Sequence, residues 1–569
     1  MVSGLNGSTI LAQSLKLLGV EQAFGVVGLV ASSLIDALCN EGIEYIGARH
    51  EASAVYMADS WIQVTRRVAV CILPGAPGVT NAVSGIVRAS LANTPLLVII
   101  GTNVSTKNDR GNLQDMKCEP MLSEYVKDYK IVPTAERIPE YVRMVCKKML
   151  AGRPGPVCLE IPFEVQLSRR DSGQYDLSIV QENRLWNKSV AVEEDIVSLA
   201  GMLVQSDRPV IIGGSGVWWS YAEHEVCELS RLLEIPYFGI SLARGVVPDD
   251  NELSMGVGSP MTSTLTHYAF ANADLIVAIG ARFNFALAFG NEPYYGSSER
   301  QAIVQIDIEP GELNANKMNL KLGLVGDAKE TLKALLRQLG KLDCRKRSRD
   351  WVSDLISLKE EEQLMLQTKS ESQGQVHPYD VMQSINSLSG RGNYFVRDGS
   401  HAGQWLIKHL RVFSPGRVLS SPNGTLGLMG AGLPMAIGIK AAYPQEEVVL
   451  YTGDGSFGFH IGEIQTAIQY NLKIIIIIHN NSAWGSCKFE QRNTFNMKAY
   501  RGVELPCNAY HEVVKAFGGE GVSVRTVEEF NNAYQTALAS TKTYCINVEL
   551  SECNDVPDFY LMDIHKKTL

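Results

Sequence analysis

The stretch between residues 448 and 481 constrains the fold of this chain more than any other segment. An apolar run at 448–451 leads into a glycine-rich turn, a helical pattern at 461–471 and five consecutive isoleucines at 474–478. Five branched side chains in a row leave no polar face for solvent, so we expect a strand buried in a parallel sheet. The pattern predicts a strand, a crossover helix and a second parallel strand, which is a unit of an α/β fold.

Polar residues follow both predicted strands. Asp454 comes after the first strand and Asn481 after the second. A right-handed strand–helix–strand unit brings both carboxyl ends to one sheet edge, where a carboxylate and an amide oxygen suit Mg²⁺. Gly453 and Gly455 let backbone N–H groups approach an anion at the helix start. Either turn alone is typical of many doubly wound folds, but the two together indicate a magnesium-bound diphosphate.

The Gly-Asp-Gly turn followed at this spacing by Asn480-Asn481 resembles the binding motif of thiamine diphosphate (ThDP) enzymes. The resemblance implies that Asp454 and Asn481 bind Mg²⁺ through their side chains and Ala483 through its carbonyl. It also implies contacts between the cofactor diphosphate and the residues of the glycine-rich turn, which are Gly453, Gly455 and Ser456.

Composition limits the class of protein and its partners. The composition, 45% hydrophobic and 20% charged, is ordinary for globular domains. A chain of 569 residues is too long for a single core. A net charge of −9 argues against nucleic acid or an anionic membrane as the main partner, and no apolar run reaches membrane-spanning length. The 11 cysteines lack CxxC pairs, and residues 1–10 lack a basic cluster before an apolar core. We therefore expect reduced thiols, no secretory signal and a cytoplasmic location.

Alternation of helical and strand-like segments divides the chain into three α/β modules. We place the first at residues 1–175, the second at 189–340 and the third at 376–569, joined by a polar linker and a charged connector. Each is expected to be a mainly parallel sheet flanked by helices. The order resembles the pyrimidine-binding, central and diphosphate-binding domains of ThDP enzymes over essentially the whole chain. It is most similar to the branch of acetolactate synthase, benzaldehyde lyase and 2-hydroxyacyl-CoA lyase, which implies a homodimer or homotetramer with active sites at subunit interfaces.

Further residues match the family's cofactor signatures. Glu51, after a predicted strand at 45–47, resembles the glutamate that contacts the cofactor pyrimidine, although a first-turn glutamate also suits a helix dipole. In the segment 424–430, Met429 resembles the side chain wedged beneath the bent cofactor, and Gly427 the residue whose carbonyl accepts from its amino group. Ser400 and His401 are candidates for contact with the diphosphate, with a simple polar turn as the alternative.

Substrate contacts are less well defined. The loop at 25–30 carries no ionisable group, whereas many decarboxylases have a histidine there. Without that acid we expect carbonyl capture to be favoured over release of a simple aldehyde. Gln114 resembles an active-site glutamine of the lyase and synthase branch, and a surface-loop role is equally compatible with it. Ser486 and His460 are weaker candidates, and we expect His460 to be structural.

The resemblance implies a ThDP- and Mg²⁺-dependent enzyme acting on a small 2-oxo acid or 2-hydroxy carbonyl compound. The first expectation is a carboligase that decarboxylates a pyruvate-like donor; the alternative is a lyase that cleaves a 2-hydroxyacyl-CoA or a benzoin-type ketone. An FAD-dependent 2-oxo acid oxidase and a non-catalytic ThDP-binding protein complete the alternatives. The turn at 213–216 lacks the full Gly-x-Gly-x-x-Gly pattern, so NAD is not expected. Whether the central domain holds FAD, an ADP or CoA moiety, or nothing stays open; Arg282 is a candidate phosphate contact, with domain packing as the alternative.

Overall fold

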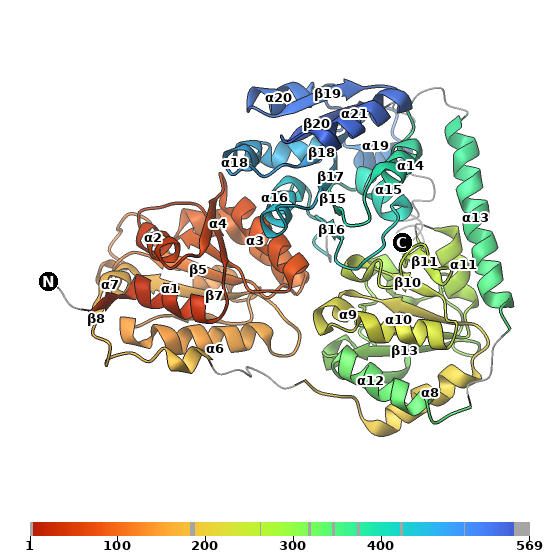
Figure 1. The fold of residues 1–569 in the computed structure, drawn as a ribbon, viewed down its shortest axis with the longest axis horizontal. Helices are drawn as coiled ribbons and strands as arrows, with labels where there is room; N and C mark the ends of the chain where they lie inside the picture. Colours follow the sequence, from red (N-terminus) through yellow and green to blue (C-terminus); the bar gives the residue numbers. More distant parts are fainter. Residues whose placement is uncertain are drawn as a thin grey trace. The chain divides into compact units, whose positions relative to one another are not determined.

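Three six-stranded sheets, all with parallel strand pairing, form the framework of the chain (Figure 1). The computed structural model describes residues 4–181, 188–261, 263–316, 320–343, 348–371, 376–421, 425–493 and 495–550. The expected three-domain α/β fold is therefore confirmed. The boundaries proposed for the domains remain predictions, and residues 551–569 of the third lie outside the described chain.

The first sheet has the strand order β3-β2-β4-β5-β7-β6. Its strands are β2 (Gln22–Gly25), β3 (Glu44–Gly47), β4 (Val70–Pro74), β5 (Leu97–Thr102), β6 (Tyr129–Ile131) and β7 (Val157–Pro162). The connecting helices are α1 (Gly7–Leu17), α2 (Ser32–Asn40), α3 (Glu51–Thr65), α4 (Pro77–Leu91), α5 (Glu119–Leu122), α6 (Ile138–Leu150) and α7 (Phe163–Leu167). A two-residue antiparallel pair, β1 (Leu5–Asn6) with β8 (Arg169–Arg170), ties the two ends of this region together.

The second sheet has the order β11-β10-β9-β12-β13-β14. Its strands are β9 (Pro209–Gly213), β10 (Tyr237–Gly239), β11 (Ser254–Val257), β12 (Leu275–Ile279), β13 (Ala302–Asp307) and β14 (Leu320–Val325). The helices are α8 (Glu193–Gln205), α9 (Ser215–Ser220), α10 (Glu223–Leu232), α11 (Thr264–Asn272) and α12 (Ala328–Leu339). The charged connector that follows contains the long helix α13 (Asp350–Glu371).

The third sheet has the order β16-β15-β17-β18-β20-β19. Its strands are β15 (Tyr394–Arg397), β16 (Val418–Ser420), β17 (Val448–Gly453), β18 (Ile475–Asn480), β19 (Glu520–Val524) and β20 (Tyr544–Glu549). The helices are α14 (Pro378–Leu388), α15 (His401–His409), α16 (Gly432–Ala442), α17 (Asp454–Phe457), α18 (Glu463–Gln469), α19 (Gly485–Asn493), α20 (Tyr510–Ala516) and α21 (Val527–Ala539). The five isoleucines lie in or next to β18 and are fully buried, as their uniform branching predicts.

By contacts, the chain forms two compact units. The first comprises the described residues of Met1–Asn187, Ser421–Gln445 and Phe459–Ile474; the second comprises those of Lys188–Ser420, Glu446–Gly458 and Ile475–Leu569. Within the first unit, α16 packs tightly on α3. A Cβ on Gly438 would lie 2.2 Å from the carbonyl oxygen of Met57, so only glycine permits this approach. Over the described ranges, no helix combines the length and the apolar character needed to cross a membrane.

Candidate active site

Three neighbouring strands of the third sheet end in polar residues. Asp398 follows β15, Asp454 follows β17, and Asn480 ends β18. The strands are adjacent and parallel, with Gly453 opposite His479 in the ladder. Backbone N–H groups of Gly455, Ala483 and Ser482 donate to the Asp454 carboxylate. The predicted meeting of the Asp454 turn and the Asn481 turn is therefore observed.

The carboxylate of Asp454 is buried and incompletely satisfied. The residue is 2% exposed, and its Oδ2 atom has no hydrogen-bond partner among the described residues. Burial raises the pKa of this carboxyl to about 6, against the opposing effect of the backbone donors. A buried anionic oxygen without a partner is costly unless a cation compensates it. This carboxylate oxygen fits a hard divalent cation such as Mg²⁺.

The two consecutive asparagines have different environments. The Asn480 side chain is buried and donates to Asn547 Oδ1 at 3.0 Å and to the Asn508 carbonyl at 3.2 Å. Its Oδ1 atom accepts from the Ser482 backbone N–H at 3.2 Å. Asn480 thus fixes the turn, whereas Asn481 is the half-buried member beside α19. This supports Asn481, and not Asn480, as the metal ligand of the pair.

Close packing places the other predicted diphosphate contacts around the same turn. A Cβ on Gly485 would lie 2.5 Å from His401 Nδ1 and 2.8 Å from Asn481 Nδ2, so both side chains border Gly485. Gly399 has a φ of +81°, and a Cβ there would lie 2.9 Å from Ser456 Oγ. Ser400 is the N-cap of α15 without a capping side-chain bond. Ser456, His401 and Asn481 therefore gather at the carboxyl edge of the third sheet.

Glu51 occupies the first position of α3, directly after the N-cap His50. Its Oε2 atom accepts from Asn81 Nδ2 at 2.9 Å, which orients the carboxylate from α4. A Cβ on Gly78 would lie 3.5 Å from Glu51 Oε1, so the glycine leaves room beside that oxygen. The carboxylate is partly exposed and held by a neutral amide.

A second buried carboxylate, that of Glu463, fixes the backbone just before α3. Both oxygens of Glu463, on α18, accept from the Arg49 backbone N–H, at 3.1 and 3.3 Å. Thr466 Oγ1 donates to the same carboxylate at 2.6 Å. Glu463 is 1% exposed and packs within the same compact unit as Glu51. This side chain therefore fixes the backbone two residues before the predicted catalytic glutamate.

The loop that carries Met429 lies in the same unit as Glu51. Gly427 has a φ of +64° and no atom near its added Cβ position, and Met429 is half-buried. Gly430 has a φ of +88°, and a Cβ there would lie 2.4 Å from that of Phe459. Ser421 Oγ donates to the Leu428 carbonyl at 3.2 Å. Packing at Gly430 and the hydrogen bond from Ser421 therefore fix the loop, whereas the space beside Gly427 is open. Gly424 of the predicted signature lies outside the described residues.

Ser53 Oγ lies 3.0 Å from His460 Nδ1, and the His50 ring meets the His460 ring edge-on at 5.5 Å. Burial lowers the pKa of His460 to about 4, so it is neutral near pH 7. These contacts suit the structural role expected of it. Gln114 is exposed with a φ of +63°, in a loop where backbone N–H groups donate to the Asp115 carboxylate; among the described residues, no hydrogen bond joins Gln114 to Glu51. Its catalytic role stays a prediction.

The loop at 25–30 presents apolar side chains to its surroundings. Val27 is 69% exposed and Leu29 is 81% exposed, although both are large and hydrophobic. A Cβ on Gly28 would lie 2.7 Å from Pro74, which holds the loop close to the end of β4. Apolar side chains left open next to a candidate site indicate contact with a ligand or another chain.

The glycines at 213–216 serve backbone packing. A Cβ on Gly214 would lie 2.3 Å from the Gly280 carbonyl oxygen, and one on Gly216 would lie 2.6 Å from the Gly280 Cα. Two turns of the second sheet therefore approach each other more closely than any side chain permits. This geometry explains the glycine-rich turn without requiring a dinucleotide.

Several residues at the site were not singled out from the sequence. The Trp484 ring lies against Gly455, where a Cβ would be 2.6 Å from it. His479 is buried on β18 with its Nδ1 atom 2.9 Å from Tyr451 Oη, and burial lowers its pKa well below the ordinary range. Asn81 and Glu463 carry no local motif and are identified only by their contacts with Glu51 and Arg49. The Trp484 position, three residues after Asn481, was the one available signal.

Models of three domains of thiamine pyrophosphate (TPP) enzymes match the chain in order; thiamine pyrophosphate is another name for ThDP. The N-terminal TPP binding domain matches residues 5–121, the central domain residues 196–335 and the C-terminal TPP binding domain residues 398–548. The last of these contains Ser400, the Asp454 turn and the Asn481 turn, and the first contains Glu51.

Similar proteins have several activities. The 2-hydroxyacyl-CoA lyase 1 of Mus musculus is 29% identical over 98% of this chain and 96% of its own length. A probable acetolactate synthase large subunit of Methanocaldococcus jannaschii is 27% identical over 97% of this chain and 93% of its own. Oxalyl-CoA decarboxylase of Escherichia coli K12 is 26% identical over 99% of this chain and 98% of its own length.

Proposed function

The chain belongs to the thiamine pyrophosphate enzymes, and we propose that it is a ThDP- and Mg²⁺-dependent carbon–carbon carboligase or lyase. In the direction we favour, it removes CO₂ from a 2-oxo acid such as pyruvate and transfers the remaining acyl group to a carbonyl acceptor. The observation that carries the proposal is the buried Asp454 carboxylate, with a free oxygen at the sheet edge where Asn481 and Ala483 follow the next strand.

Each half of the proposed site has a separate task. Asp454, Asn481 and the Ala483 carbonyl hold Mg²⁺, while the backbone N–H groups of the turn at 453–456 bind the diphosphate. Glu51, oriented by Asn81, would exchange a proton with the bound cofactor at its carboxylate. When bound, thiamine diphosphate supplies the carbon nucleophile and the electron sink of the reaction. Met429 and the Gly427 carbonyl, in the loop before α16, would contact the cofactor's ring system.

The choice of transfer over simple aldehyde release follows from the apolar loop at 25–30. Aldehyde release requires a proton donor that faces the reacting carbon. Val27 and Leu29 project from this loop and offer none. Without a proton donor in this loop, capture of a second carbonyl is favoured over protonation.

Cleavage of a 2-hydroxyacyl-CoA is the second candidate. It uses the same cofactor residues in the reverse direction, and two of the similar proteins, from Mus musculus and Arabidopsis thaliana, are named 2-hydroxyacyl-CoA lyase. We further propose a cytoplasmic enzyme that is a homodimer or homotetramer with active sites at the subunit interface.

Product analysis of the purified full chain tests the proposal. The protein is incubated with ThDP and Mg²⁺ and given either pyruvate or a 2-hydroxyacyl-CoA, and the products are identified by mass spectrometry. CO₂ together with acetolactate or a hydroxyketone supports the carboligase, and an aldehyde one carbon shorter than the acyl chain, together with formyl-CoA, supports the lyase. Release of CO₂ with free acetaldehyde alone contradicts the role assigned to the apolar loop. A flavin absorption band in the purified protein favours an oxidase.

The matched control is Glu51→Gln. It keeps the size of the side chain and its ability to hydrogen-bond, so ThDP binding should persist. Turnover should fall by about two orders of magnitude or more, because the general acid–base group is lost. Full turnover in this variant removes Glu51 from the proposed mechanism.

A further inference from the structure

A line of hydrogen bonds crosses three neighbouring strands of the third sheet and reaches the turn at 480–484, called the metal turn below. Asn480 Nδ2, on β18, donates to Asn547 Oδ1, on β20, at 3.0 Å. Asn547 Nδ2 donates to Ser523 Oγ on β19 at 3.1 Å, and Ser523 Oγ donates to Glu549 Oε1 at 2.6 Å. Arg525 Nε donates to the other carboxylate oxygen of Glu549 at 2.7 Å. Because the strands lie in the order β18-β20-β19, the line runs from the metal turn to the edge of the sheet.

The carboxylate at the outer end sets the direction of the bonds in this line. The bonds from Ser523 and Arg525 lower the pKa of Glu549, so its oxygens act as acceptors near pH 7. Ser523 has one hydroxyl hydrogen and gives it to this carboxylate at 2.6 Å, in preference to the Asn547 carbonyl at 3.2 Å. Ser523 Oγ can then only accept from the Asn547 amide, which turns the amide oxygen of Asn547 toward Asn480.

This orientation supports the backbone of the metal turn. Asn480 gives its two amide hydrogens to Asn547 and to the Asn508 carbonyl, so its Oδ1 atom faces the Ser482 backbone N–H and accepts from it at 3.2 Å. Ser482 has a φ of +54°, in the left-handed region that favours glycine. A serine stays in this region only where its surroundings fix it.

The strained serine lies between two of the proposed metal ligands, Asn481 and Ala483. A change of φ at Ser482 would rotate the chain that follows it and move the Ala483 carbonyl relative to the Asn481 side chain. Backbone pairing with the segment 503–505 holds the far side of the turn, since the Leu505 N–H donates to the Ser482 carbonyl at 2.8 Å. On the near side, the Asn480 side chain provides the support.

Burial makes the bond between the two asparagines hard to replace. Asn480 and Asn547 are each 1% exposed, so bulk water cannot take the place of either partner. Without an acceptor at position 547, one Asn480 N–H would be buried and unsatisfied, which is costly. Asn480 could then find a new acceptor only by rotating, and rotation breaks its bond to Ser482.

From this arrangement we propose that Asn547 is a positioning residue for the metal site. Together with Glu549 it orients Asn480, and Asn480 holds Ser482 in the left-handed conformation that sets the spacing of Asn481 and Ala483. The inference rests on the proposed function, because it takes these two residues as Mg²⁺ ligands.

Magnesium titration of the full chain tests the proposal. Calorimetry gives the Mg²⁺ concentration that half-saturates ThDP binding, and amide hydrogen exchange over 481–484 is measured without metal or cofactor. Asn547→Leu keeps the approximate size of the side chain and should raise that Mg²⁺ concentration by about tenfold, as for other residues that orient a metal ligand. Hydrogen exchange over 481–484 should become faster. Ser523→Ala, at a half-buried position, should shift both quantities in the same direction by less.

Ser482→Gly links the effect to the left-handed backbone. Glycine adopts a positive φ without support, so adding Ser482→Gly to Asn547→Leu should recover most of the lost Mg²⁺ affinity. No such rescue is expected if Asn547 contributes only to the stability of the sheet. Thermal unfolding of each variant verifies that it is folded.

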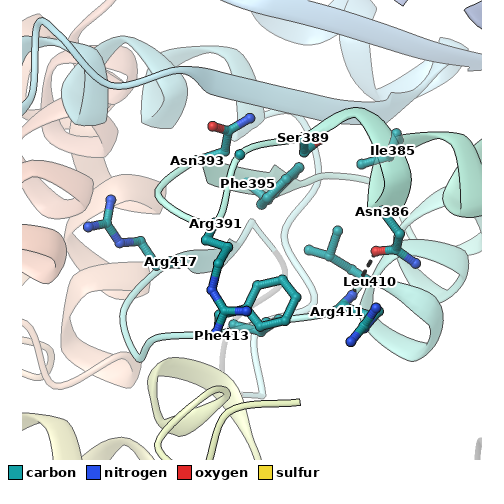
Figure 2. A pocket seen from close by; sticks show the side chains of 12 residues that line it. Ile385, Asn386, Ser389, Arg391, Asn393, Phe395, Leu410, Arg411, Phe413 and Arg417 are labelled. Atoms are coloured by element: carbon teal, nitrogen blue, oxygen red, sulfur yellow. Dashed lines mark hydrogen bonds between the residues drawn. The ribbon is translucent and has the colours of Figure 1, made fainter. Parts of the chain in front are cut away.

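Asn386→Leu is the matched control. The Asn386 amide also bridges two backbone groups, since it donates to the His409 carbonyl and accepts from the Arg411 N–H, both at 2.8 Å (Figure 2). It lies near the end of α14, which leads to the start of β15, whereas the metal turn follows the end of β18. Its substitution should lower the unfolding temperature and leave the half-saturating Mg²⁺ concentration unchanged.

The outcomes separate this inference from the proposed function. An unchanged Mg²⁺ requirement in Asn547→Leu, or a double variant with Ser482→Gly that recovers nothing, overturns the positioning role alone. Asp454→Ala should abolish Mg²⁺-dependent ThDP binding whether or not Asn547 positions the turn. If the wild type binds ThDP without any dependence on Mg²⁺, the proposed metal site is wrong and the positioning role is overturned with it.

Discussion

At the residue scale, Asp454 joins stability to cofactor binding. Burial raises the pKa of its carboxyl from the ordinary 3.8 to about 6. In the protein without metal, lowering the pH therefore protonates this carboxyl near pH 6 in the folded state and only near pH 3.8 in the unfolded state. Above pH 6 the carboxyl is ionised in both states, and its burial costs on the order of 3 kcal/mol. The free-energy cost of burying the Asp454 carboxylate therefore decreases as the pH falls from 6 to 4.

Asp454→Asn should remove that penalty. Without metal, we expect the variant to unfold at a higher temperature than the wild type at pH 7.5, with the difference vanishing near pH 4. It should also lose the stabilisation by Mg²⁺ and ThDP, because the ligand charge is gone. Mg²⁺ affinity of the wild type should decline below pH 6, where protons compete for the carboxylate.

Thermal unfolding with and without Mg²⁺ and ThDP measures these effects. Asp354→Asn is the control, since Asp354 is exposed on α13 and its substitution removes the same charge from the surface. If metal-free Asp454→Asn is less stable than wild type at pH 7.5, the buried carboxylate is compensated in another way.

The spacing of Asp454 and Asn481 could be predicted from the sequence because both follow strands whose apolar runs are unmistakable. The partner of Glu51 could not be predicted in this way. Asn81 lies 30 positions away on another helix, and its role depends on how α3 and α4 pack. The different environments of Asn480 and Asn481 likewise depend on Asn547 and Asn508, which accept from the Asn480 side chain and which no local sequence pattern connects to it.

At the scale of elements, α3, α4 and the cofactor loop share one buried ion pair. Arg88 on α4 and Asp59 on α3 are both completely buried and form a salt bridge. Gln63 donates to Asp59 at 2.7 Å, and Arg88 Nε donates to the Ser421 carbonyl at 3.2 Å. Ser421 in turn binds the Leu428 carbonyl, one residue before Met429. The pair therefore connects the helix that begins with Glu51 to the loop that carries Met429.

Arg88→Met should destabilise the fold by about 3–5 kcal/mol, because it leaves the Asp59 charge buried without a partner. The double variant Arg88→Met with Asp59→Leu should recover much of that loss, since no charge then remains buried. Both variants should bind ThDP more weakly, as Ser421 has lost its donor. Denaturant unfolding gives the free energies and ThDP titration the affinities; a double variant as unstable as the single one contradicts this account.

Element positions were predicted best where strands are uniformly apolar. The expected strands at 448–451 and 474–478 coincide with most of β17 and β18. The crossover helix was expected at 461–471 and is shorter, as α18 covers Glu463–Gln469. A 3-10 turn at Gly458–His460 precedes it and Gly462 is its N-cap, so α18 begins after the apolar periodicity at Ile461.

At the scale of the whole molecule, the proposal places the active sites at subunit interfaces. Glu51 and Met429 belong to the first unit, and Asp454 and Asn481 to the second. If the active site forms at a subunit interface, the glutamate and the metal ligands come from different chains. A symmetric dimer then has two sites, each with one Glu51 and the partner's Asp454.

Mixing two inactive variants distinguishes this arrangement from a site within one chain. Glu51→Gln and Asp454→Ala should each be inactive alone. In a mixed dimer, one site carries both substitutions and the other carries neither. Random reassociation of equal amounts should therefore restore about a quarter of the wild-type activity per chain. The subunits are unfolded together and refolded, and activity is compared with a mixture of separately refolded variants. If refolding together restores nothing while wild type recovers, Glu51 and Asp454 act within one chain.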